Sequence, residues 1–234
     1  MSKRRLDSYK GKLNPNQIAE GINVAILNAQ RLAEDAQILL DACRYPTAAS
    51  MAILSIEESG KTSILRQLAL AETDEEASRI WKGYRSHTKK NVLWLMPQLM
   101  MKGARQLDDF RPLFEPVAEH PYILDQVKQI SFYTDCLGEA HWSKPTEVVD
   151  KELATMLTQI AKIFVAKNEV TTKEIELWIK HIGRTKNGTL KEQKESLLHW
   201  YAEMQESELA PKGQDIKDIL EWLGLNTANE QLLS

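Results

Sequence analysis

The chain has 234 residues, of which 43% are hydrophobic and 27% charged, and its net charge is −3. These values are ordinary for a soluble protein of one domain, or one domain with an extension, and they exclude a disordered chain. The low content of Gly (10) and Pro (8) favours helices over a β-sandwich with many tight turns.

Residues 1–13 carry five basic residues and one acid without a periodic apolar face, so we predict a flexible basic arm. Asn14 and Gln17 form a capping box that starts a helix. Apolar residues spaced by three and four then predict about seven helical turns, with Cys43 in the apolar stripe and the end just before Pro46. A second helix opens at Pro46, and the short connection makes the two helices antiparallel neighbours.

A third helix is expected to begin at the capping box of Thr73 and Glu76 and to continue through Val92 to a kink at Pro97. The rest of this part of the chain is predicted as a loop over 106–121, a helix over about 121–136 and a helix from Pro145 to about Lys167. These helices form an antiparallel bundle over residues 14–167.

Residues 168–234 hold eight basic and twelve acidic residues, so this part is acidic while the rest of the chain is close to neutral. It is predicted to contain short helices capped by Thr171 with Glu174 and by Thr189 with Glu192, and a last helix over Asp215–Leu223. The expected fold class is therefore all-α, an antiparallel helical bundle with a short helical C-terminal extension.

No apolar stretch reaches the roughly 20 residues of a membrane span, and no apolar segment follows the basic N-terminal residues as in a secretory signal. We therefore expect a cytoplasmic protein with no membrane partner. Cys43 and Cys136 are far apart and lack metal-ligand spacing, which predicts free thiols.

Residues 79–105 hold seven basic residues and no acid. A solvated helix face is one interpretation, and a surface that binds the phosphates of RNA is the other. The six candidates for RNA binding are Arg79, Lys82, Arg85, Lys89, Lys102 and Arg105.

The second predicted helix contains Glu57, Glu58 and Lys61, which share one edge because they are three and four residues apart. An exposed ion pair of little energetic value is one interpretation. The other is a buried polar cluster, since the partner helix also carries Asn28 and Asp35 among apolar residues.

His87 and Lys90 are three residues apart on the third predicted helix. A histidine beside cations favours its neutral form and can act as a base near neutral pH, although a structural role is the alternative. No group of residues has the spacing of metal ligands, so we expect neither a metal nor a cofactor.

Several motifs occur in a fixed order: Asn28, Asp35, Arg44-Tyr45-Pro46, Glu57-Glu58-Ser59-Gly60-Lys61, His87, Lys90, Lys128, Tyr133-Thr134-Asp135, Trp142 and Pro145. This order resembles the AbiV family of abortive infection proteins, which is similar to the HEPN-like helical domains. The resemblance covers about residues 17–165, and the Glu-Glu-x-Gly-Lys element is its most specific part.

The resemblance implies a helical bundle, usually a homodimer, that serves bacterial defence against phage. Many HEPN relatives are metal-independent ribonucleases whose site has an Arg, four to six residues, and then a His. Here Arg79 precedes His87 by eight positions and Arg85 by two. The site residues carried over by position are Glu57, Glu58, Lys61, His87, Lys90, Tyr133 and Asp135.

Three hypotheses for function follow. The first is an effector that binds and cleaves RNA and so arrests translation, with His87 as base and Lys61, Arg85 and Lys90 stabilising the phosphorane while Glu58 orients a lysine. The second is a non-catalytic dimeric module that binds a phage protein or a component of translation, in which the polar cluster is architectural. The third is a nucleotide pocket in the same cluster.

Overall fold

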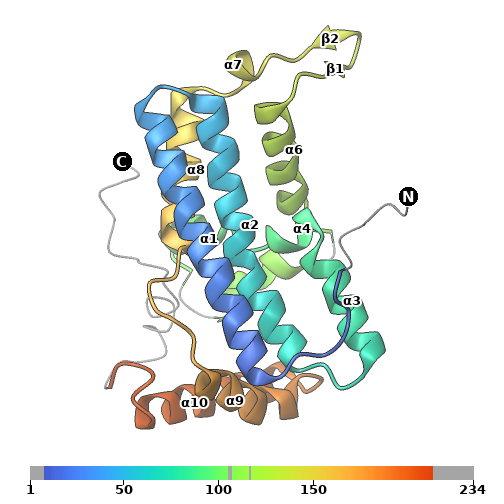
Figure 1. The fold of residues 1–234 in the computed structure, drawn as a ribbon, viewed down its shortest axis with the longest axis vertical. Coiled ribbons are helices and arrows are strands. Elements are labelled where there is room, and N and C mark those ends of the chain that lie inside the picture. Colours follow the sequence, from blue (N-terminus) through green and yellow to red (C-terminus); the bar gives the residue numbers. More distant parts are fainter. Residues whose placement is uncertain (1–7, 105–106, 116, 213–234) are drawn as a thin grey trace, which may run out of the picture.

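The computed structural model describes residues 8–104, 107–115 and 117–212. Within them the fold is all-α apart from one small hairpin, as the composition predicts (Figure 1). None of the described helices has the length and the apolar character that a membrane span requires. Cys43 and Cys136 are both free and exposed.

The bundle is built on two long antiparallel helices, α1 (Pro15–Asp41) and α2 (Tyr45–Ala69). The predicted capping box of Asn14 and Gln17 starts α1. Small residues line the contact, and the Ser55 hydroxyl donates to the Ala29 carbonyl oxygen at 2.7 Å. Cys43 was expected in the helical stripe, which is wrong: it lies in the connection, exposed, with a φ of 59° that reverses the chain.

Two further helices pack on α2 from different sides. α8 (Lys151–Phe164) lies behind α1 and α2, and α6 (His120–Phe132) lies along the other flank of α2 (Figure 1). The helix predicted from Pro145 is split into α7 (Pro145–Val148) and α8, because the Asp150 side chain accepts from the Leu153 N–H and caps a new helix. The shared core consists of Ala33, Ala36, Ala48, Ala49, Ala52, Ile53, Ile56, Leu124, Val149, Ala154, Leu157, Ile160 and Ala161.

The third predicted helix is also divided. α3 (Asp74–Tyr84) begins at the Thr73 cap as expected, but the backbone is extended at Ser86 and the chain restarts as α4 (His87–Lys90). After a turn, α5 (Met96–Met101) has Pro97 in its first turn, and a 3-10 helix, η1 (Leu107–Phe114), lies in the predicted loop. The break turns α4 toward α2 and α6, where its polar residues find partners.

Between α6 and α7 the chain forms a hairpin of two strands, β1 (Cys136–Leu137) and β2 (His141–Trp142). The strands are antiparallel, with Cys136 opposite Trp142 and Leu137 opposite His141. Figure 1 shows this hairpin projecting from the upper end of the bundle, beyond α6.

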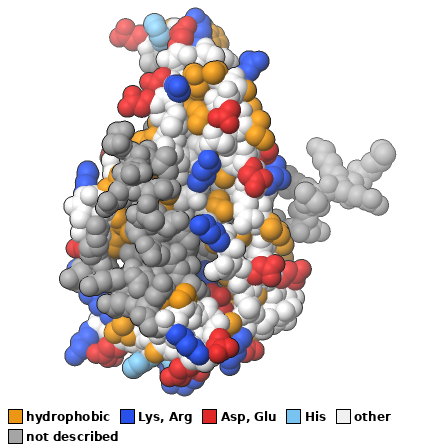
Figure 2. Space-filling view, turned by 90° about the vertical axis from the view of Figure 1, so that its left-hand side faces the viewer, with side chains coloured by type: hydrophobic (Ala, Val, Ile, Leu, Met, Phe, Trp, Pro, Cys, Tyr) orange, Lys and Arg blue, Asp and Glu red, His pale blue; other side chains and the backbone are white. Residues whose placement is uncertain are grey.

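The described part of the extension contains α9 (Thr172–Ile182), η2 (Gly183–Thr185) and α10 (Leu190–Glu206), and both predicted caps are present. It crosses the lower end of the bundle (Figure 1). Arg66 of α2 pairs with the buried Glu174 at 2.7 Å. Charges of both signs intermingle on this end of the face drawn in Figure 2. The helix expected over Asp215–Leu223 lies outside the described residues.

Candidate active site

A buried carboxylate stands at the centre of the site. Glu57 lies in the middle of α2 and its side chain is 2% exposed. Its Oε2 atom lies 2.6 Å from Nδ1 of His87 and 3.3 Å from Nζ of Lys90, both on α4. Its Oε1 atom accepts from Nζ of Lys128 on α6 at 2.5 Å. One side chain therefore joins three helices.

The charge on Glu57 is set by these neighbours. Burial by itself raises the pKa of this carboxyl, but hydrogen bonds from Lys128 and His87 and the charges of Lys128 and Lys90 outweigh it. The pKa of Glu57 is therefore below its ordinary value, and the group is ionised at neutral pH. An ionised carboxylate only accepts hydrogen bonds, so Nδ1 of His87 must carry a hydrogen.

A glycine allows α4 to approach α2. A Cβ atom at Gly60 would overlap the carbonyl oxygen of Lys90. The absence of a side chain at this position lets the backbone of α4 lie directly on α2, one turn after Glu57. The close approach brings Lys90 and His87 within reach of the Glu57 carboxylate.

His87 is the site residue with direct access to solvent. Its side chain is 51% exposed although Nδ1 is held by the buried carboxylate. With a hydrogen on Nδ1, neutral His87 has a free lone pair on Nε2. A carboxylate that orients an imidazole in this way also stabilises the imidazolium that forms when the ring accepts a proton. The pair is thus equipped for general base and acid chemistry.

Glu58 and Lys61 form a second pair on the same helix. The Lys61 Nζ atom lies 2.5 Å from Oε1 of Glu58, and both side chains are mostly buried, Lys61 being 18% exposed. The ammonium group also lies 5.1 Å from the centre of the Tyr84 ring, which adds a cation–π contact. Glu58 therefore holds the Lys61 ammonium group against Tyr84, the last residue of α3, three residues before His87.

A cation position beside Glu57 is filled by a protein ammonium group. Glu57, His87 and Asp125 each offer one ligand atom within 4.8 Å of the others, which is the kind of group that can hold a metal. Nζ of Lys128, however, lies 2.5 Å from Glu57 and 2.8 Å from Asp125. A metal ion would have to displace this lysine, whose charge balances the carboxylates together with Lys90.

Lys128 and Asp125 are the site residues that the candidate set lacks. Both lie on α6, and Lys128 is buried between Leu124 and Ser131 on the face turned to α2. The signal in the sequence is the position of Lys128, four residues after the buried Leu124 and so on the same face of the helix. A lysine on a buried face needs a carboxylate partner.

Four other candidates from the sequence, Asn28, Asp35, Tyr133 and Asp135, are not among the residues that bind Glu57. Arg31, exposed on α1, binds Asp35 and Asn28 at 3.0 Å each, so these two belong to the outer face of α1. Tyr133 is exposed after the end of α6. Asp135 caps the hairpin by accepting from the Cys136 N–H at 2.7 Å.

The predicted basic residues differ in their contacts. Arg79 and Lys82 on α3, Lys89 on α4 and Lys102 after α5 are all exposed. Arg85 is hydrogen-bonded within the protein: its guanidinium donates to the carbonyl oxygens of Tyr9 (2.6 Å) and Trp81 (3.2 Å). Arg105 lies outside the described residues.

Comparison with known families adds an independent finding. The HEPN family AbiV matches residues 17–166, from the first turn of α1 to the end of the bundle. The matched range includes Glu57 and the residues around it, His87, Lys90, Asp125 and Lys128. No curated protein and no solved structure matches the chain significantly. The match covers well over half of the sequence. The chain therefore belongs to the AbiV family, and this membership supports a general role in abortive infection and defence.

Proposed function

We propose that the chain acts in abortive infection by cleaving RNA without a metal ion, with His87 as the general base. The observation that carries the proposal is the contact of a half-exposed imidazole with a buried, ionised carboxylate, 2.6 Å from Glu57 Oε2 to His87 Nδ1. A core histidine would be covered, and a solvated one would have no such partner.

In the proposed reaction, Nε2 of His87 removes the proton of an RNA 2′-hydroxyl. The 2′-oxygen attacks the adjacent phosphorus, the bond to the 5′-oxygen breaks, and that oxygen takes a proton from water, leaving a 2′,3′-cyclic phosphate and a 5′-hydroxyl. The hydroxide formed from water takes the proton from His87, which restores the neutral base. Cations are needed where the phosphorane gains charge. Lys61 and Lys89 are the candidates near His87, whereas Lys90 and Lys128 act through Glu57 as positioning residues.

The test is cleavage of total RNA by the purified full chain in EDTA. We expect cleavage by the wild type and a loss of about 100-fold or more in His87→Ala, the range for removing a general base. His141→Ala, a change of an exposed histidine in the hairpin, is the matched control and should keep full activity. Equal cleavage by His87→Ala and wild type would remove His87 from the mechanism, and no cleavage by wild type would contradict the proposal.

A second candidate function is a non-catalytic homodimeric module that binds a phage protein or a component of translation. The observation in its favour is the burial of Glu57, Lys90 and Lys128, which ties α2, α4 and α6 together as an architectural network would. Light scattering gives the oligomeric state. If wild type cleaves nothing and Glu57→Gln sharply lowers the melting temperature, this function is favoured.

A further inference from the structure

The outer face of α1 carries a regular line of exposed residues. Their spacing alternates between three and four, which places them along one stripe of a single continuous helix. The residues between them are all buried or half-buried, so the stripe is the part of α1 turned to solvent. We call it the α1 seam, and its members are Val24, Leu27, Arg31, Glu34, Ile38 and Asp41.

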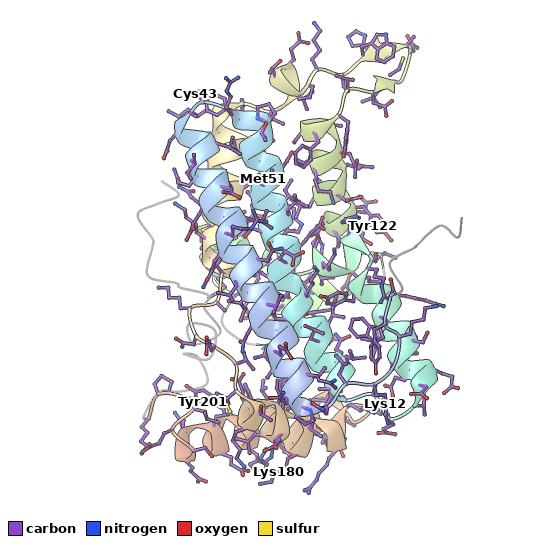
Figure 3. The ribbon with its side chains drawn as sticks, viewed as in Figure 1. Lys12, Cys43, Met51, Tyr122, Lys180 and Tyr201 are labelled. Atoms are coloured by element: carbon purple, nitrogen blue, oxygen red, sulfur yellow. The ribbon has the colours of Figure 1, made fainter. Side chains whose placement is uncertain are left out.

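Three residues of the α1 seam are large and apolar. Val24, Leu27 and Ile38 are 61%, 64% and 65% exposed. Beside the second half of the seam lies a groove of about 530 Å³ between α1 and α8, lined in part by Glu34, Ile38 and Val165. Figure 3 allows α1 to be followed from Lys12, before its start, to Cys43, beyond its end. Apolar side chains aligned on one helix next to a groove indicate a contact surface.

The α1 seam is complementary to itself when two copies of α1 run antiparallel. With the two-fold axis between Leu32 and Ala33, Leu27 of each copy faces the partner's Ile38. In the same register, Arg31 of each copy faces the partner's Glu34. Apolar residues therefore meet apolar residues, cations meet anions, and the symmetry makes each contact twice.

Other pairings of two α1 helices match less well. A parallel pair places Arg31 against Arg31 and Glu34 against Glu34, which sets like charges together. An antiparallel pair shifted by one heptad sets Leu27 against Arg31 in one direction and Glu34 against Ile38 in the other. The pattern of charges thus selects one direction and one register.

We propose that two copies of this chain associate through the α1 seam, antiparallel, with the two-fold axis between Leu32 and Ala33. Within one chain, Arg31 already lies 3.0 Å from Asp35, so in the pair its guanidinium bridges carboxylates of both copies. The inference names the interface of the homodimer in the second candidate function, on which it rests for its partner, and it does not depend on RNA cleavage.

The pairing leaves both candidate active sites accessible. α4, which carries His87, packs on α2 and α6. Figure 1 shows α4 across α2 from α1, and in Figure 3 Tyr122 of α6 lies on that same side. A dimer joined by α1 therefore covers neither His87, and loss of the dimer should not change cleavage at this site.

The first test measures association of the purified full chain by sedimentation velocity over a range of concentrations. We expect a dimer for the wild type. Leu27→Gln/Ile38→Gln should raise the Kd of the dimer about 100-fold or more, because two apolar contacts are lost on each side of the axis. The control, Ile123→Gln/Leu198→Gln, changes two exposed apolar residues on α6 and α10 and should leave the Kd unchanged.

The second test examines the register with charge reversals. Arg31→Glu and Glu34→Arg, each alone, set like charges opposite one another, and each should raise the Kd about tenfold or more. Mixed in equal amounts, with one variant fluorescently labelled, the two chains present opposite charges at both crossings. We expect the mixed dimer to recover the wild-type Kd. Circular dichroism checks that each variant is folded.

The outcomes separate this inference from the proposed functions. A wild-type monomer would overturn the inference and the homodimeric function together. A wild-type dimer that Leu27→Gln/Ile38→Gln does not weaken would overturn the inference alone, since the homodimer then uses another face. A mixture that associates no more tightly than either charge variant would also overturn it. RNA cleavage that is equal in the dimeric wild type and the monomeric variant is the result expected if the two sites work independently of the α1 seam.

Discussion

Nδ1 of His87 lies 2.6 Å from Oε2 of Glu57, so a half-exposed ring is held by an almost completely buried carboxylate. A second histidine contacts a carboxylate through its other ring nitrogen: Nε2 of His181 lies 2.6 Å from Oε2 of Glu203. Hydrogen bonds from Lys180 and His181 hold the pKa of Glu203 below its ordinary value, so both carboxylates are ionised at neutral pH.

The two histidines should therefore adopt opposite tautomers. An ionised carboxylate accepts, so neutral His87 carries its hydrogen on Nδ1 and neutral His181 carries it on Nε2. Nitrogen-15 NMR, recorded about two units above the ordinary histidine pKa of about 6.5, distinguishes protonated from bare ring nitrogens. A bare Nδ1 on His87 would contradict the proposed role of Nε2 as the base, while His181 serves as the internal reference.

Glu57 should make stability depend on pH. Its folded pKa is below the ordinary value of 4.5, so its stabilisation is complete above that value and is lost as the pH falls through the folded pKa. Glu57→Gln removes the carboxylate that Lys90 contacts and leaves the buried Lys128 with Asp125 alone. We expect urea denaturation to show a loss of about 3 kcal/mol at pH 7.

The difference between Glu57→Gln and wild type should begin to shrink below about pH 4.5, where the carboxyl of the unfolded chain takes up its proton, and should be smallest below the lowered folded pKa, where the folded carboxyl is neutral as well. Glu58→Gln is the matched control, because Glu58 is less buried than Glu57 (17% against 2% exposed) and pairs with one lysine only, so the change should cost less, about 1 kcal/mol. A difference between Glu57→Gln and wild type that stays constant from pH 3 to pH 7 would show that the charge of Glu57 has no role.

Helix starts could be predicted because their signals are local. Asn14 with Gln17 and Thr189 with Glu192 form complete capping boxes where the sequence places them, since both partners lie within one turn. The break at Ser86 has a different cause. It depends on the contact of α4 with Gly60, a residue 26 positions earlier in the chain. The spacing of apolar residues within 79–92 therefore does not predict a helix break at Ser86.

The site was predictable in part for the same reason. Glu58 and Lys61 are three residues apart on one helix, so their contact follows from helical spacing. Glu57 finds its partners 30 and 71 positions away, at His87 and Lys128. Which of two neighbouring glutamates turns inward is decided by the packing of α4 and α6 on α2.

Asn23 should hold the beginning of the extension on the bundle. Its side chain on α1 donates to the Val170 carbonyl oxygen at 2.9 Å and accepts from the Val170 N–H at 2.8 Å. Asn23→Leu keeps the volume but leaves two backbone groups without these partners. We expect a loss of about 2 kcal/mol in urea denaturation.

The control for this change is Asn28→Leu on the same helix, where the amide contacts only the exposed Arg31 and the cost should stay within about 0.5 kcal/mol. Equal stabilities of the two variants would mean that the Val170 contacts add nothing to the attachment of the extension.

Gly60 and Gly83 should respond in opposite directions to the same substitution. A Cβ atom at Gly60 meets the backbone carbonyl of Lys90, which cannot move unless α4 separates from α2. We expect Gly60→Ala to destabilise the protein by about 2 kcal/mol, although alanine is the better helix former, and to weaken cleavage because His87 moves with α4.

Gly83, inside α3, has no atom within 4 Å of such a Cβ, so Gly83→Ala should stabilise by about 0.5–1 kcal/mol. Thermal denaturation of both variants tests this directly, and a Gly60→Ala protein as stable as Gly83→Ala would show that α4 does not need the close approach that brings His87 to Glu57.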